Sequence, residues 1–106
     1  MIYKVDISDE AKIDLHGIYK YIAFKLLSPE NAVEQIRRLQ KSILSLNEMP
    51  KRFRLYDREP WKSRGLRVVP VDNYIVFYIP NDEKKVVTVI RIMYSGRDID
   101  NELNTV

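Results

Sequence analysis

The stretch that decides the fold runs from Ser8 to Leu46 and reads "SDEAKIDLHGIYKYIAFKLLSPENAVEQIRRLQKSILSL". Apolar residues recur in it every three or four positions, which is the spacing of one helix face. The pattern occurs twice, with a break at "LLSPEN" between the two halves. We therefore predict two helices, with apolar faces made of Ala11, Leu15, Ile18, Ile22 and Leu26 in the first and Val33, Ile36, Leu39, Ile43 and Leu46 in the second.

Residues at the ends of these patterns predict where each helix starts and stops. Ser8 can cap the first helix through its hydroxyl. Pro29 disfavours a helical Ser28, so Ser28 as N-cap and Pro29 as first helical residue open the second helix. Pro50 closes it. We expect two helices of about five turns each, joined by about three residues and packed as an antiparallel hairpin.

Strand patterns flank the two helices. Before them, Tyr3, Val5 and Ile7 alternate with polar residues, the two-residue period of a half-buried strand. After them come "LRVVPV" (66–71), "YIVFYI" (74–79) and "VVTVIRIMY" (86–94), which short turns should pair as an antiparallel meander. Pro70 suggests an edge strand or a bulge, and Pro80 should end its strand.

The order of these elements predicts one α+β domain over residues 1–106. It consists of an N-terminal strand, an antiparallel two-helix hairpin and a three-stranded antiparallel meander, with the helices on one face of a small sheet. A chain of 106 residues is long enough for one modest core and too short for a second domain.

Composition excludes several classes of protein. The sequence is 45% apolar and 31% charged, and it has no apolar run of the ~18 residues that a membrane span needs. It also shows no secretory signal, so we expect a cytoplasmic protein. With no cysteine, the chain has no disulfide, thiolate zinc site or thiol nucleophile.

Positive charge is concentrated between Lys51 and Arg67, which we call the basic segment. It holds seven basic residues against Asp57 and Glu59, while the whole chain carries only +3. Such a segment attracts an acidic partner. Its aromatic residues Phe53, Tyr56 and Trp61 fit RNA stacking, a protein interface or simply the core. Our candidate target-binding residues are Lys51, Arg52, Arg54, Arg58, Trp61 and Arg97.

Acid–base and metal chemistry find little support. His16 is the only histidine, lies off the apolar face of its helix and is expected in solvent. Asp98, Asp100 and Glu102 fit a helix start or charge pairs better than a metal site, because hard cations need oxygens converging from several segments. We predict no metal and no cofactor. Arg91, inside a strand, should share a face with Val87, Val89 and Met93. It either reaches solvent on the face opposite the helices or pairs with a carboxylate, and we favour the pairing.

Arg97 follows the last strand directly after Gly96. Its guanidinium offers a rigid fork for a phosphate or a carboxylate of a target. It can equally form a salt bridge to Asp98, Asp100 or another carboxylate that fixes the tail of the domain. The sequence leaves both roles open.

These segments together resemble the RelE/ParE superfamily, the small toxins of bacterial type II toxin–antitoxin modules. "SDEAKIDLHGIYKYI" resembles the first helix of the family, "YIVFYI" its central strand, and "VVTVIRIMYSGRDIDNEL" its last strand with the ending Arg97-Asp98. The resemblance implies a three- to four-stranded antiparallel sheet with a helical hairpin. It also implies a role in plasmid stabilisation and a cognate antitoxin whose extended or helical segment wraps the domain, in some cases within a higher-order complex.

Two branches of the superfamily differ in target. ParE-like members have a long helical hairpin and poison DNA gyrase, whereas RelE-like members cut mRNA on the ribosome. The long hairpin favours the ParE-like branch. RelE-like enzymes carry an arginine after the tyrosine of the central strand and a tyrosine beyond the last arginine; here Ile75 follows Tyr74 and no tyrosine follows Arg97.

We therefore expect a gyrase-binding, growth-inhibiting toxin without proton-transfer machinery that presents one cationic surface to an acidic macromolecule. The alternative is a ribosome-dependent mRNA endoribonuclease. It would rely on electrostatic help from the catalytic candidates Lys62, Arg64, Arg67 and Arg97. A third possibility is a toxin-derived interaction module without toxicity.

Overall fold

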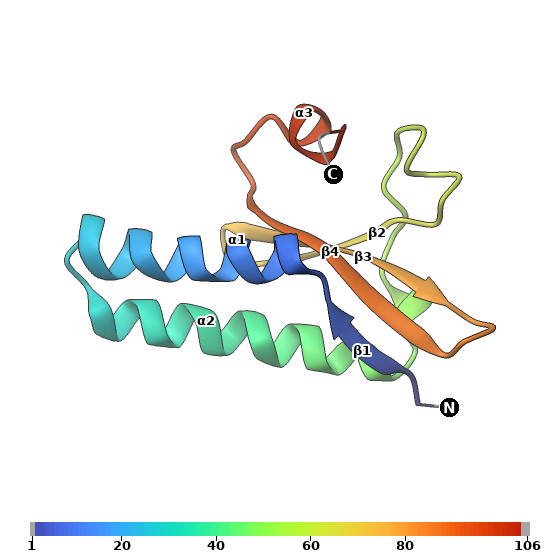
Figure 1. Ribbon diagram of the computed structural model, residues 1–106, viewed down its shortest axis with the longest axis horizontal. Coiled ribbons are helices and arrows are strands. Elements are labelled where there is room, and N and C mark those ends of the chain that lie inside the picture. The colour runs from blue at the N-terminus through green and yellow to red at the C-terminus, as the bar shows by residue number, and fades with distance from the viewer. Residues whose placement is uncertain (1, 105–106) are drawn as a thin grey trace.

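A computed structural model describes residues 2–104 as a helical hairpin packed on a four-stranded sheet (Figure 1). The predicted α+β fold and element order are confirmed. The elements are β1 (Lys4–Ile7), α1 (Asp9–Lys20), η1 (Tyr21–Lys25), α2 (Pro29–Leu44), η2 (Ser45–Asn47), η3 (Pro50–Arg52), β2 (Arg67–Val71), β3 (Tyr74–Asn81), β4 (Val86–Tyr94) and α3 (Ile99–Asn104). Within these residues no helix has the length and apolarity that a membrane crossing requires.

The hairpin consists of α1, its π-helical continuation η1, and α2. The Ser8 hydroxyl accepts a hydrogen bond from the Ala11 amide at 3.1 Å, so the predicted cap is confirmed. Pro29 opens α2 as predicted. The Ser28 side chain, however, does not cap α2, because its hydroxyl accepts from Nδ2 of Asn31 at 2.7 Å instead of from the helix backbone.

The buried face of α2 differs from the predicted one at the N-terminal end of the helix. Ala32 and Gln35 are buried, whereas Val33 is 46% exposed. Leu26, predicted at the end of the first apolar face, is 55% exposed because the chain has already left the helix there. Leu39, Ile43 and Leu46 are buried as predicted.

The strand order in the sheet is β1-β4-β3-β2. The meander β2–β3–β4 is antiparallel, as predicted, but β1 pairs with β4 in parallel through Lys4 to Ile7 opposite Val86 to Val89. The expectation of a fully antiparallel sheet is therefore wrong. The helical hairpin separates β1 from the meander, so the direction of β1 is not set by a short turn, and β1 runs parallel to β4. Pro70 lies in the edge strand β2, as predicted, whereas β3 continues past Pro80 to Asn81.

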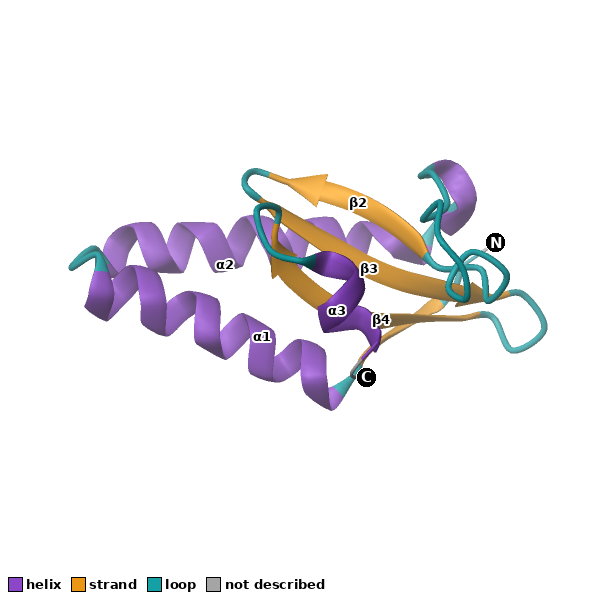
Figure 2. Cartoon of the chain, turned by 90° about the horizontal axis from the view of Figure 1, so that it is seen from above, coloured by secondary structure: helices purple, strands orange, loops and turns teal. Residues whose placement is uncertain are grey.

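Both faces of the sheet are covered. On one face, α1 and α2 pack over Val76, Tyr78 and Val89. On the other face, Phe77 and Met93 share a buried cluster with Leu103 of α3 and Trp61 of the basic segment. Figure 2 shows α3 lying over β3 and β4. Residues of α3 and the basic segment thus give the sheet a second core.

A register shift in β4 changes which residues share a face. Phe77 pairs with Arg91 but Tyr78 pairs with Val89, which leaves Ile90 as an extra residue. Ile92 consequently joins Val87 and Val89 beneath the helices, and Met93 belongs to the opposite core. The prediction that Arg91 shares one face with Val87 and Val89 is wrong for this reason.

Candidate functional site

A groove of about 1120 Å³ lies between the helical hairpin and the end of the sheet formed by the β2–β3 turn and the end of β4. Half of its lining residues are apolar or aromatic, and the others include two arginines and one carboxylate. The lining residues are Ile13, Asp14, Gly17, Ile18, Tyr21, Ile22, Leu26, Ser28, Asn31, Gln35, Arg38, Asn73, Tyr74, Ile92, Tyr94 and Arg97. A concave surface of this kind suits the docking of a ligand or a peptide segment.

One wall of the groove is fixed by the turn between β2 and β3. Asp72 adopts a positive φ of 56° there and accepts hydrogen bonds from Arg38 Nε at 2.7 Å and from Gln35 Nε2 at 3.0 Å. The hydrogen bond from Arg38 is the main reason that the pKa of Asp72 is lowered from its ordinary value. These contacts tie the turn to α2 and set the width of the groove at that end.

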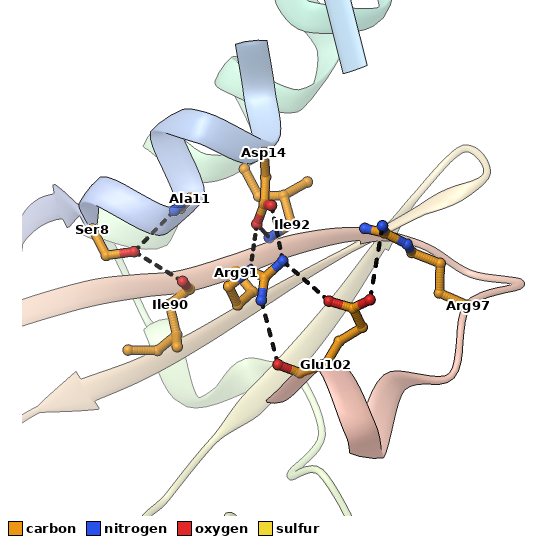
Figure 3. Close-up of polar contacts among 8 residues, drawn as sticks. All are labelled: Ser8, Ala11, Asp14, Ile90, Arg91, Ile92, Arg97 and Glu102. Carbon is orange, nitrogen blue, oxygen red and sulfur yellow. Dashed lines mark hydrogen bonds and ion pairs between the residues drawn. The ribbon is translucent and has the colours of Figure 1, made fainter. Parts of the chain in front are cut away.

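Arg91 and Asp14 hold the opposite wall (Figure 3). Nε and Nη2 of Arg91 donate to the two carboxylate oxygens of Asp14 at 2.7 and 3.0 Å, and the Ile92 amide donates to Oδ2 at 2.9 Å. The predicted pairing of Arg91 is confirmed. Beyond Val89, where β1 has ended, Asp14 thus provides the hydrogen-bond acceptor for the Ile92 amide at the edge of β4.

The same arginine reaches the C-terminal helix. Nη1 of Arg91 donates to the Glu102 carbonyl at 3.3 Å, and Nη2 lies 3.6 Å from the Glu102 carboxylate. The side chains of Arg91 and Asp14 are only 12% and 10% exposed. The hydrogen bond to Asp14 is the main reason that the pKa of Arg91 is raised. One buried guanidinium therefore links α1, β4 and α3.

Arg97 lines the groove and remains half exposed. Its Nη2 lies 3.8 Å from Oε1 of Glu102, at the limit of an ion pair, and 49% of its side chain is exposed. The tail-fixing alternative thus has a partner, Glu102, although the contact is long. Since such exposed pairs contribute little stability, the guanidinium stays available to an incoming carboxylate or phosphate.

Proton-transfer groups are scarce around the groove. His16 is exposed, as predicted, and lies in a separate small depression with Lys12 and Tyr19. Tyr74 packs edge to face on Tyr94 at 6.0 Å, and burial raises its pKa. Among the groove residues in the described part of the chain there is no histidine to exchange a proton near neutral pH.

Several cations of the basic segment are engaged within the molecule. Arg67 donates to the carbonyls of Phe53 at 2.6 Å and Lys51 at 3.1 Å. Arg52 donates to the carbonyls of Glu48 and Met49 at 2.5 and 3.2 Å, which anchors the turn after α2. Further pairs join Lys51 to Asp82, Arg58 to Asp100 at 3.1 Å, and Arg64 to the face of Trp61 at 4.9 Å.

The aromatic residues of the basic segment pack inward. Trp61 is 8% exposed in the second core, so its ring is not presented to a target from the surface. Tyr56 packs against the same core and donates a hydrogen bond to Asp100. Phe53 packs at the edge of the first core. The core role that the sequence left open is therefore the one the structure supports.

The candidate cations do not share one concave surface. Arg97 lines the groove, whereas none of Lys51, Arg52, Arg54, Arg58, Lys62, Arg64 and Arg67 is part of its described lining. The expectation of a single cationic surface is wrong, because Arg97 lines the groove, whereas the basic segment runs from the edge of the first core at Phe53 to the second core at Trp61. Arg54, Arg58, Lys62 and Arg64 remain exposed there.

The C-terminal carboxylates behave as a helix start and charge pairs, as predicted. Asp98 accepts from Nδ2 of Asn101 at 2.9 Å, while Asp100 binds Arg58 and Tyr56. Over residues 2–104 no three potential metal-binding side chains of histidine or carboxylate type come together.

Sequence reasoning missed most of the groove. Ile13 and Tyr94 are 71% and 52% exposed, and neither belongs to a predicted apolar face or candidate site. An apolar residue standing outside the helix pattern, as Ile13 does, was the available signal. Arg38 carried no signal, because its role depends on the distant Asp72.

A family model described as the ParE toxin of the type II toxin–antitoxin system parDE matches residues 5–99. No curated protein sequence gives a significant match. Among solved structures, a chain of the chromosomal ParDE system from P. aeruginosa is similar with a TM-score of 0.72 at 18% identity, covering 88% of this chain and 96% of that one.

RelE-type structures are similar as well. The E. coli toxin RelE, a mutant in the free state, aligns with a TM-score of 0.67 at 18% identity over 96% of this chain and 93% of its own. A chain of the RelBE2 toxin–antitoxin complex from Mycobacterium tuberculosis aligns with a TM-score of 0.63 at 20% identity over 89% and 99%. At these identities the structures establish a shared fold.

Proposed function

Because the chain belongs to the ParE toxin family of type II toxin–antitoxin systems, we propose that it inhibits growth by binding DNA gyrase. The observation that carries this proposal is the family match over residues 5–99. The fold agrees with it, since the hairpin of α1, η1 and α2 is long.

The site favours binding over catalysis. A general acid or base contributes about 10²–10⁴-fold to a rate, and it works best when its pKa lies near the operating pH. Asp14 is occupied by Arg91 and the Ile92 amide, and the pKa of Tyr74 is raised. What the groove offers is apolar surface with Arg38 and Arg97, which is suited to holding a partner.

A cognate antitoxin is the second partner that we propose. Solved relatives include RelBE toxin–antitoxin complexes. We propose that a segment of the antitoxin lies in the groove, with apolar side chains against Ile13 and Tyr94 and a carboxylate at Arg97. Ile13→Asp should then weaken antitoxin binding, measured by calorimetry, with Ile2→Asp as control because Ile2 is also exposed and lies outside the groove.

A supercoiling assay tests the gyrase proposal. Purified protein is titrated into gyrase, relaxed plasmid and ATP, and the supercoiled product is measured. We expect inhibition that the antitoxin reverses. Gyrase that remains fully active at saturating protein would overturn the proposal.

The alternative function is ribosome-dependent mRNA cleavage. It is favoured by the likeness to RelE and by the exposed Lys62 and Arg64, which can stabilise a developing phosphorane charge. Primer extension on translated mRNA decides it, because cuts that appear only with the protein and the ribosome would support this function over gyrase binding.

A further inference from the structure

The tip of the helical hairpin presents large apolar side chains to solvent. Tyr21, Phe24, Leu26 and Leu27, which we call the hairpin tip, are 52, 68, 55 and 83% exposed. Figure 1 places the η1–α2 connection at the end of the molecule farthest from the N-terminus. Single exposed apolar residues are ordinary, but four within seven positions form a patch of the kind that marks interaction sites.

The outward direction of these side chains is fixed by packing beneath them. Ile22, Ala23 and Ala32 form a small buried core at the same end of the hairpin. The tip is therefore a packed structure, and its exposed residues do not result from a loose end that failed to bury them.

Backbone geometry at the tip is irregular in two ways. Tyr21–Lys25 form a π-helical turn, with the Leu26 amide donating to the Tyr21 carbonyl at 3.0 Å. Leu27 has a φ of 54°, which is unfavourable for a residue with a branched side chain. π-Turns and left-handed residues of this type occur often at functional sites.

Charge indicates the kind of partner. Residues 19–28 contain Lys20 and Lys25 and no carboxylate, and both lysines are exposed. A second copy of the chain would bring like charges together, whereas a surface with carboxylates around an apolar pocket would complement them. Tyr21 and Leu26 also line the groove, but Phe24 and Leu27 lie outside it and stay accessible when the groove is filled.

We propose that the hairpin tip inserts Phe24 and Leu27 into an apolar pocket bordered by carboxylates on the protein that the toxin inhibits. Lys20 and Lys25 pair with those carboxylates. Phe24 and Leu27 thus form a part of the target-binding surface that lies outside the groove that takes the antitoxin. This inference rests on the proposed function, since it needs a protein target.

The test compares three variants with the wild-type protein. Phe24→Ser with Leu27→Asn removes the apolar contact, and asparagine tolerates the left-handed backbone of residue 27 better than leucine. Lys20→Glu with Lys25→Glu reverses the charge without touching the apolar residues. Leu44→Ser with Met49→Ser is the matched control, since both residues are exposed, at 65 and 74%, and lie outside the tip.

Three readouts are measured for each protein: growth arrest in cells, the concentration that half-inhibits gyrase, and antitoxin affinity. Both tip variants should abolish growth arrest and raise the half-inhibitory concentration about thirtyfold, as expected for loss of a central interface contact. Their antitoxin affinity should stay within about twofold of wild type, because none of the four substituted residues lines the groove. The control should match wild type throughout.

Other results separate this inference from the proposed function. If the tip variants are as toxic as wild type, the inference is overturned and the proposed function is unaffected. The same conclusion follows if the tip variants lose antitoxin binding to the same extent as they lose toxicity. If the wild-type protein arrests growth without inhibiting gyrase, gyrase is rejected as the target. The growth assay of the tip variants then still tests the role of the tip. A wild-type protein that does neither overturns both.

Two further outcomes would assign the tip to another occupant and overturn the inference. In the first, the wild-type protein sediments with anionic phospholipid vesicles, and the tip variants no longer do so but remain toxic. In the second, the wild-type protein is a dimer in analytical ultracentrifugation, whereas both tip variants are monomers and remain toxic.

Discussion

Arg91 links three elements through one side chain, and its partner Asp14 is almost as deeply buried. Asp14→Ala should lower the free energy of unfolding by about 3 kcal/mol, because it leaves a buried guanidinium without its main partner. Urea denaturation measures this loss. Asp6→Ala is the control, since Asp6 pairs with Lys4 at 3.6 Å on the surface and should cost less than about 1 kcal/mol.

Arg97 differs from Arg91 in exposure and in the length of its ion pair. We predict that Arg97→Ala abolishes toxicity in a growth assay while the free energy of unfolding changes by less than about 1 kcal/mol. Arg37→Ala, which removes an exposed cation of α2 paired with Glu34 at 2.9 Å, is the control and should stay toxic. A large loss of stability in Arg97→Ala would instead assign this residue to fixing the tail.

Two tyrosines should make stability depend on alkaline pH. Burial raises the pKa of Tyr56 to about 12 and that of Tyr78 to about 12, against an ordinary value of 10.0. A raised folded-state pKa gives stability that is complete below the unfolded pKa and is lost as pH rises through the folded pKa. The urea midpoint should therefore fall between about pH 10 and 12. Tyr56→Phe should show a shallower fall, and an unchanged slope would contradict the assignment.

At the scale of elements, α3 and the basic segment depend on each other through the second core. Leu103 is fully buried beside Trp61, the only tryptophan in the chain. Leu103→Ala should destabilise the protein by about 3 kcal/mol, as a buried leucine truncation does. Tryptophan emission should shift to longer wavelength as water reaches the ring, and the exposed neighbour substitution Asn104→Ala should leave it unchanged.

The hairpin and the meander could be predicted because their signals are local. Helical spacing, the cap at Ser8 and the proline at position 29 act within a few residues of the structure they specify. The parallel pairing of β1 with β4 joins residues about eighty positions apart, so no local sequence pattern predicts it. The extra residue Ile90 likewise breaks an alternation that looks regular in sequence.

The candidate site was harder to predict than the fold. A run of cations looks the same in sequence whether its members face a target or bind nearby carbonyls, as Arg52 and Arg67 do. The groove is built by the meeting of α1, α2 and β4, and it exists only in three dimensions. Arg97 could be proposed as a candidate because its place after the last strand is itself a local feature.

At the scale of the whole molecule, surface carboxylates should contribute to the loss of stability in acid. Hydrogen bonds from Arg38 lower the pKa of Asp72, and those from Lys51 and Tyr3 lower the pKa of Asp82. A lowered folded-state pKa gives stability that is present above the unfolded pKa and is lost as pH falls through the folded pKa. The thermal midpoint should thus decline below about pH 4. Asp82→Asn should decline less steeply, and an equal decline would contradict this origin.

The parallel pairing of β1 with β4 also determines at which point of its synthesis the chain can complete its fold. β1 can take its place only after the chain through Val89 has emerged from the ribosome, since that residue completes its ladder. Domains generally fold as units, so the sheet is completed only when both of its distant strands are available. The complete fold therefore forms only near the end of each round of synthesis, when the antitoxin that we propose can bind it.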